Sequence, residues 1–126
     1  MYLVDTNILL FSLDQTEKLS HKIIDILENE EILYISMVSF WEIEIKRNLG
    51  KPKIPYNPIE LAEYFLSQSY LIKDININHI AELQQLPVIH NDPFDRLLIA
   101  QAIADNLVIL TSDRTIPQYP VQCVQN

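Results

Sequence analysis

Short, continuous apolar runs alternate along the chain with segments in which apolar residues recur at helical spacing. The continuous runs are typical of strands buried on both faces of a parallel sheet, and we expect them at residues 2–4, 32–35, 70–72 and 107–110. An edge strand is expected at residues 121–124, kept short by the prolines before it. The helical spacing predicts helices at residues 8–13, 20–30, 40–49, 59–67, 76–86 and 93–104. This alternation predicts a three-layer α/β/α domain with a central parallel sheet.

The helix at residues 93–104 carries two carboxylates into an apolar segment. Pro93 suits the first helical position, so we expect Asp92 to be the N-cap and Asp95 the third residue of the helix. Capping and the helix dipole would account for both acids by themselves. Two predicted strands, however, also lead into aspartates, Asp5 and Asp113.

Glu42 admits two interpretations. The segment from Ser39 to Glu42 has the form of a capping box, in which Glu42 would bond to backbone, and the helix begins at either Ser36 or Ser39. Glu42 also shares a helix face with Val38, Ile45 and Leu49, with no basic residue on that stripe. We therefore expect Glu42 to point inward and to need a partner, because an isolated buried charge is costly.

Composition restricts the possible functions. The 126 residues fit one domain, 1–126, and the apolar runs are too short to span a membrane. With no signal-peptide pattern and a lone cysteine, we expect a cytoplasmic protein. The single glycine excludes glycine-rich nucleotide-binding loops, and the net charge of −8 argues against broad nucleic-acid binding. Basic residues gather only around residues 46–53, as a solvated helix end or a local nucleic-acid contact.

The acids are expected to meet at one edge of the sheet. The carboxyl ends of parallel strands and the N-termini of the helices that follow them share that edge, where Asp5, Glu42, Asp95 and Asp113 would lie. Four carboxylates in one cleft repel one another, and Mg²⁺ or Mn²⁺ would resolve the conflict with open positions for a phosphate oxygen. We expect all three histidines to lie outside this set, which disfavours zinc. The chemistry that fits is metal-assisted phosphodiester cleavage.

Four segments, in unbroken order, resemble the PIN-domain ribonucleases, and more narrowly the VapC-type toxins of bacterial type II toxin–antitoxin pairs. They are Asp5-Thr6-Asn7, Trp41-Glu42-Ile43, Asp92-Pro93-Phe94-Asp95-Arg96 and Thr111-Ser112-Asp113. The resemblance implies a PIN-like fold and a Mg²⁺- or Mn²⁺-dependent endoribonuclease that cuts single-stranded regions of RNA and is silenced by a cognate antitoxin.

The resemblance also implies roles for particular residues. Asp5 and Asp95 would be the principal metal ligands, and Glu42 a ligand or a residue that orients water. Asp113 would be a further acid that acts directly or through water, and Asn7 would orient the site. Asp92 is expected only to cap the helix, because the site carboxylate in the family's motif corresponds to Asp95.

The sequence also leaves three alternative functions. A phosphoacceptor receiver domain has this length and acids at strand ends, but it needs an acidic pair after the first strand and a lysine after the last, and no lysine follows Lys73. A non-catalytic binding module and an RNA-processing nuclease without a toxin role are further alternatives. Apolar surface on helices within residues 11–27 and 40–49 would bind an antitoxin or a second copy, and we expect both, including a homodimer.

Overall fold

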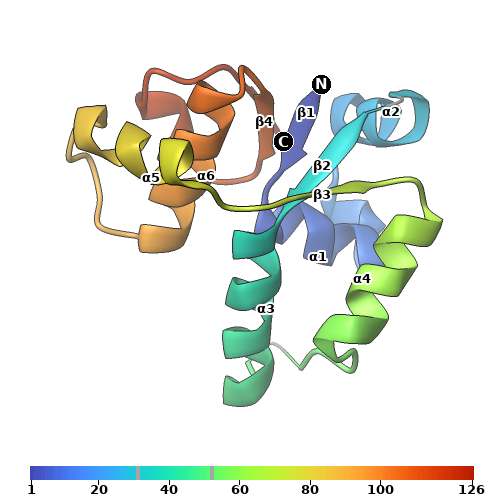
Figure 1. The fold of residues 1–126 in the computed structure, drawn as a ribbon. Coiled ribbons are helices and arrows are strands. Elements are labelled where there is room, and N and C mark those ends of the chain that lie inside the picture. Colours follow the sequence, from blue (N-terminus) through green and yellow to red (C-terminus); the bar gives the residue numbers. More distant parts are fainter. Residues whose placement is uncertain (31, 52) are drawn as a thin grey trace.

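A five-stranded parallel sheet forms the centre of the protein in a computed structural model (Figure 1). The structure describes residues 1–30, 32–51 and 53–126. The strands are β1 (Tyr2–Val4), β2 (Leu33–Ser36), β3 (Leu71–Lys73), β4 (Val108–Thr111) and β5 (Cys123–Gln125). They lie in the order β3-β2-β1-β4-β5, so the first strand of the chain is central and β5 is at an edge, as predicted. The predicted parallel sheet is confirmed, with the bounds of β1 as predicted and those of the other strands shifted by one or two residues.

Helices cover both faces of this sheet. They are α1 (Thr6–Asp14), α2 (His21–Asn29), α3 (Met37–Leu49), α4 (Pro58–Ser67), α5 (Ile77–Glu82) and α6 (Pro93–Ala104), with short 3₁₀ turns at Thr16–Lys18, Leu83–Gln85 and Ile116–Gln118. Figure 1 shows α5 and α6 on one side of the sheet and α1, α2 and α4 on the other. Within the described ranges, no helix combines the length and the apolarity that crossing a membrane requires.

Each face of the sheet has its own core. One cluster joins Leu9 of α1 and Phe65 of α4, and the other is built around Leu98 of α6. Because successive strand residues point to opposite faces, Leu3 of β1 packs in the α6 cluster and its neighbour Val4 in the other. The predicted three-layer α/β/α architecture is therefore confirmed.

Side-chain caps fix where the helices begin. Asp92 accepts hydrogen bonds from the N–H groups of Phe94 and Asp95, and Pro93 takes the first helical position, as predicted. Helix α1 begins two residues earlier than predicted: Asp5, with extended backbone, is the N-cap, and Thr6 is the first helical residue. The strand ends one residue before Asp5, so its carboxylate is the first that can reach the exposed N–H groups of α1.

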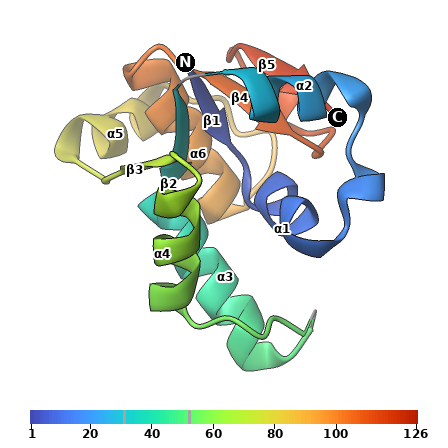
Figure 2. The ribbon, with the colours of Figure 1, turned by 90° about the vertical axis from the view of Figure 1, so that its right-hand side faces the viewer.

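Helix α3 begins at Met37 with Ser36 as its N-cap, which decides between the two starts considered. Ser39 lies inside the helix, so the capping box that would have engaged Glu42 does not form. The predicted inward stripe is wrong at its C-terminal end, where Ile45 and Leu49 are 38% and 72% exposed. Figure 2 shows that the lower part of α3 extends past the sheet.

His79 is a buried residue of α5. It is 1% exposed, its Nδ1 accepts the N–H of Asn76, and its Nε2 lies 2.8 Å from Oδ2 of Asp105. Lys73 reaches the same oxygen at 3.0 Å. The neighbouring Ile80, although apolar, is 48% exposed. The short helix α5 packs on α6 through the His79 side, which the apolar spacing did not reveal.

Candidate metal site

Asp5 is held rigidly between the start of α1 and the end of β4. Its Oδ1 accepts the N–H of Ile8 at 2.9 Å, and its Oδ2 accepts the N–H of Ser112 at 3.2 Å. The residue is 5% exposed. Burial raises the pKa of Asp5 above its ordinary value and the charge of Asp113 adds to that, although hydrogen bonds from Thr111, Ile8 and Ser112 oppose it. The strand end therefore places a fixed carboxylate at this edge of the sheet.

Glu42 points inward from α3, as predicted. Its Oε1 accepts the hydroxyl of Thr6 at 2.6 Å, and that hydroxyl is also hydrogen-bonded to Ser39. The prediction that no basic residue shares this face was wrong, because Lys46 lies one turn further along α3 and its Nζ is 3.3 Å from Oε2 of Glu42. A long lysine side chain can run back along a helix while its ammonium group stays in water. The buried end of Glu42 is thus partly neutralised by its own helix.

Asp95 occupies the third position of α6, and its side chain is 15% exposed. Burial, hydrogen bonding with Asp113 and the charges of Asp92, Asp113 and Glu42 together raise the pKa of Asp95 to about 8. Asp95 therefore holds a proton at neutral pH when no cation is bound. This is the outcome expected for crowded carboxylates without compensating charge.

Asp113 is the charged partner of this pair. Its N–H donates to Oγ1 of Thr111, and its Oδ1 accepts the N–H of Thr115 at 2.8 Å. Burial alone would raise the pKa of Asp113, but the hydrogen bonds from Thr115 and Asp95 and the nearby His90 outweigh burial and hold the pKa below its ordinary value. Because one acid is protonated and the other ionised, they can lie side by side without full repulsion.

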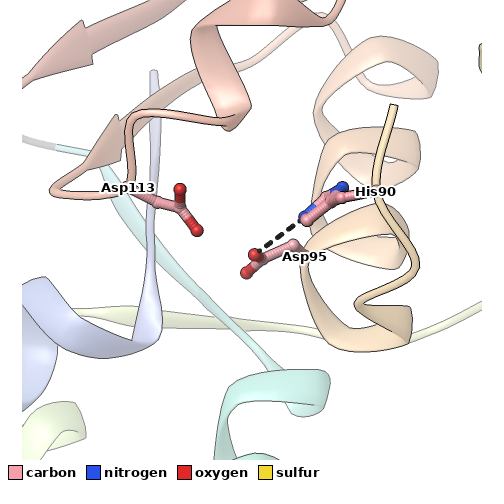
Figure 3. Close-up of side chains that lie close together, drawn as sticks. All are labelled: His90, Asp95 and Asp113. Carbon is pink, nitrogen blue, oxygen red and sulfur yellow. Dashed lines mark hydrogen bonds and ion pairs between the residues drawn. The ribbon is translucent and has the colours of Figure 1, made fainter. Parts of the chain in front are cut away.

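His90 lies among the acids, which corrects the prediction that all three histidines stand outside the set. Its Nε2 is 3.2 Å from Oδ2 of Asp95, and one ligand atom each of His90, Asp95 and Asp113 lie within 4.8 Å of one another. Figure 3 shows the three side chains pointing toward a common space. The reason is local: the loop before the Asp92 cap folds back over the first turn of α6. The only sequence signal was the position of His90, just before that helix start.

Tyr119 holds the His90 ring. Its Oη lies 2.7 Å from Nδ1 of His90 and accepts the backbone N–H of the same residue at 3.2 Å. Arg96 donates to the same oxygen at 3.1 Å. Burial would raise the pKa of Tyr119, but the hydrogen bonds from His90 and Arg96 lower it. Tyr119 is 29 residues from His90 in the chain, and no spacing rule pointed to the pair.

The remaining predicted residues occupy defined places. Asn7 is the second residue of α1 and is exposed, and Asp92 caps α6. Asp5 and Glu42 lie outside the tight cluster of His90, Asp95 and Asp113, but the charge of Asp113 acts on Asp5 and that of Glu42 acts on Asp95. The predicted acids therefore gather at one edge of the sheet, while their individual roles remain predictions.

The clustered residues fit a divalent cation. Ligands on one six-coordinate ion with bonds of about 2.1 Å lie roughly 3 Å apart when adjacent and roughly 4.2 Å apart when opposite. The ligand atoms of His90, Asp95 and Asp113 fall within a comparable span. Carboxylate oxygens suit Mg²⁺ and Mn²⁺, and a cation would favour the ionised form of Asp95.

Comparison with known proteins places the chain in a family. The model of the PIN domain matches residues 2–121, so the chain belongs to the PIN-domain family, and the resemblance predicted from the sequence is confirmed at that level. No curated protein sequence matches the chain.

Solved structures share its fold. A crystal structure of VapBC2 from Rickettsia felis bound to a DNA fragment from their promoter is 18% identical, with 98% of this chain and 97% of that chain covered and a TM-score of 0.72. DNA-bound VapBC from Salmonella typhimurium is 19% identical, with 98% and 96% covered and a TM-score of 0.71. FitAcB from Neisseria gonorrhoeae is 19% identical, with 100% and 97% covered and a TM-score of 0.64. At these identities the likeness establishes the fold.

Proposed function

We propose that the protein is a metal-dependent endoribonuclease. The observation that carries the proposal is the convergence of Asp5, Glu42, Asp95 and Asp113, from four separate segments, at one edge of a PIN-domain sheet. Metal-dependent hydrolysis of RNA phosphodiester bonds is what the resemblance to PIN-domain ribonucleases implies for such a set. The raised pKa of Asp95 supports it, because a site in which crowding disfavours the ionised form of one acid is suited to a cation.

Each acid has a proposed task. Asp5 and Asp95 would hold Mg²⁺ or Mn²⁺, with Glu42 as a ligand or a residue that orients water. Asp113 would act directly or through water, and the exposed Asn7 would orient the site. A bound cation would supply a water of lowered pKa and stabilise the extra negative charge of the transition state. The hydrogen bonds of Asp5 to the N–H groups of Ile8 and Ser112 keep its carboxylate oriented throughout.

Within this proposal, the protein is the toxin of a toxin–antitoxin pair. The folds that it matches are those of VapBC and FitAcB, and its sequence resembles VapC-type toxins. Its apolar surface is suited to a partner: Trp41, Leu49 and Ile59 are 60%, 72% and 71% exposed on α3 and α4. A pocket of about 270 Å³ between these helices is lined by Met37, Phe40, Pro58, Ile59, Ala62, Glu63, Leu66 and Ile72. This face would bind the antitoxin or a second copy in a homodimer.

The strand order weighs against the receiver-domain alternative. A receiver has the order 2-1-3-4-5, whereas this sheet has the order 3-2-1-4-5. An RNA-processing PIN nuclease without a toxin role differs from a toxin in its substrate and its regulation. The effect of expression on cell growth distinguishes the two. Expression alone should arrest growth and co-expression with an adjacent antitoxin should relieve it, whereas a processing enzyme would be harmless at high level.

A cleavage assay tests the catalytic proposal. The substrate is a structured RNA with exposed loops, incubated with purified protein in Mn²⁺, in Mg²⁺ or in EDTA. Wild type should cut in the loops only with a cation, and Asp95→Asn should lower the rate by orders of magnitude. Glu44→Gln is the control, because it also removes one carboxylate charge, but from a residue whose side chain is paired with Arg47. Cleavage that persists in EDTA, or equal rates in wild type and Asp95→Asn, would refute the proposal.

A further inference from the structure

The imidazole of His90 adds a nitrogen atom to a site otherwise made of oxygen ligands. Its Nε2 lies 3.2 Å from Oδ2 of Asp95, and the ligand atoms of His90, Asp95 and Asp113 form one group within 4.8 Å. The side chain of His90 is 23% exposed, so the ring is partly buried and does not simply extend into water. In Figure 3 the ring and the two carboxyl groups face the same space from different segments.

We propose that His90 is a metal ligand through Nε2, and that it makes the site prefer divalent transition-metal ions such as Mn²⁺ and Co²⁺ over Mg²⁺. The inference rests on the proposed metal-dependent function and specifies which ion the site selects. Mg²⁺ is a hard cation that takes oxygen ligands and keeps several waters, so a nitrogen ligand adds little to its binding affinity. Transition-metal ions bind imidazole more strongly, in the order that rises from Mn²⁺ to Co²⁺ and Ni²⁺.

The hydrogen bonds of Tyr119 prepare the ring for this role. The Tyr119 oxygen is 2.7 Å from Nδ1 of His90, and its own O–H can be donated to the carbonyl of His90 at 3.5 Å. In that arrangement the oxygen accepts a hydrogen bond from Nδ1–H, and the lone pair of Nε2 faces the acids. Ligating histidines are commonly fixed in this way by a partner on the other ring nitrogen.

Arg96 fixes the other end of this arrangement. One nitrogen of its guanidinium group donates to the Tyr119 oxygen at 3.1 Å and to the carbonyl of Pro87 at 2.8 Å. The loop that carries His90 and the first turn of α6 that carries Asp95 are therefore tied together through Tyr119. The side chains of His90 and Asp95 are therefore in place before an ion binds, and Tyr119 acts as a positioning residue.

Metal binding alone tests the inference, without RNA. Titration calorimetry of the metal-stripped protein with Mn²⁺, Co²⁺ and Mg²⁺ should give a lower Kd for the two transition metals. His90→Gln offers an amide oxygen near the position of Nε2. This variant should raise the Kd for Mn²⁺ and Co²⁺ by about tenfold or more, while the Kd for Mg²⁺ should change by less than about threefold. His21→Gln, which changes an exposed histidine at the start of α2, is the control and should match wild type.

A spectroscopic measurement on the wild type does not depend on the folding of any variant. Pulsed electron paramagnetic resonance of the Mn²⁺-bound protein should show hyperfine coupling to a directly bound ¹⁴N, and labelling the histidines with ¹⁵N should change that coupling accordingly. Tyr119→Phe should retain the nitrogen signal but weaken Mn²⁺ binding. No nitrogen coupling in wild type, or Mn²⁺ and Mg²⁺ affinities that fall together in His90→Gln, would overturn the inference. Coupling without any RNA cleavage would instead refute only the nuclease role.

Discussion

Replacing Asp95 by asparagine should change how the stability of the metal-free protein depends on pH. Asparagine keeps the size of the side chain and a hydrogen-bonding carbonyl but cannot ionise. In the wild type the pKa of Asp95 is raised to about 8, first by burial and then by Asp113 and the neighbouring charges. In the unfolded chain an aspartate titrates at about 3.9. Between these two values the folded protein holds a proton on Asp95 that the unfolded chain releases.

The sign and the size of the effect follow from this difference. Because the folded state binds more protons, its free energy of unfolding falls as the pH rises from about 4 to about 8. One such proton contributes at most about 1.4 kcal/mol per pH unit. The Asp95 side chain is 15% exposed, and water reduces the effect. We expect wild type to lose about 2–3 kcal/mol relative to Asp95→Asn between pH 5 and pH 8.

Asp92→Ala provides the comparison on the same helix. Asp92 caps α6 by accepting the N–H groups of Phe94 and Asp95, and its loss should cost roughly 0.5–2 kcal/mol at every pH. The pH slope should flatten but persist, since the charge of Asp92 ranks after burial and the Asp113 hydrogen bond among the causes that raise the pKa of Asp95. RNA cleavage should remain mostly intact in Asp92→Ala and fall by orders of magnitude in Asp95→Asn.

The assay is urea unfolding of metal-stripped wild type and both variants, followed by circular dichroism at pH 5, 6, 7 and 8. Subtracting the variant curves removes the contributions of titrating groups that do not interact with Asp95. Parallel curves for wild type and Asp95→Asn would show that the crowding of the acids does not displace the pKa of Asp95. A stable but inactive Asp92→Ala beside an active, destabilised Asp95→Asn would mean that the assignment of the two acids is inverted.

Three further measurements address the metal, the core and the buried histidine. Millimolar Mn²⁺ should raise the melting temperature of wild type by mass action, and Asp5→Asn, which keeps a good helix cap, should remove that response in a thermal melt. Leu98→Ala should lower the free energy of unfolding by about 2–5 kcal/mol in urea titrations, because Leu98 is 1% exposed under the sheet, whereas exposed Leu49→Ala should change it little. His79→Ala should cost roughly 1–3 kcal/mol in the same titrations, since it leaves the Asn76 N–H without its acceptor and Asp105 with Lys73 alone, and no loss would mean that water replaces the ring.

The sequence alone determined the architecture and the start of the key helix, because both depend on local rules. Continuous apolar runs separated by amphipathic segments are compatible with few folds other than a parallel sheet covered by helices, and the structure has such a sheet. Pro93 and Asp92 specify a helix start through the fixed φ of proline and the reach of a short carboxylate, and α6 begins there. The ends of β1 and β4 deliver Asp5 and Asp113 to one edge for the same topological reason.

Only the tertiary structure decided which side chains meet. His90 reaches Asp95 because a loop folds back on α6, and Tyr119 reaches His90 from 29 residues away. Lys46 reaches Glu42 along its own helix, although its spacing suggested a solvated face. The exposure of Ile45 and Leu49 depends on where α3 leaves the sheet. Helical periodicity assigns a face to a residue, but what that face meets depends on the position of segments distant in the chain.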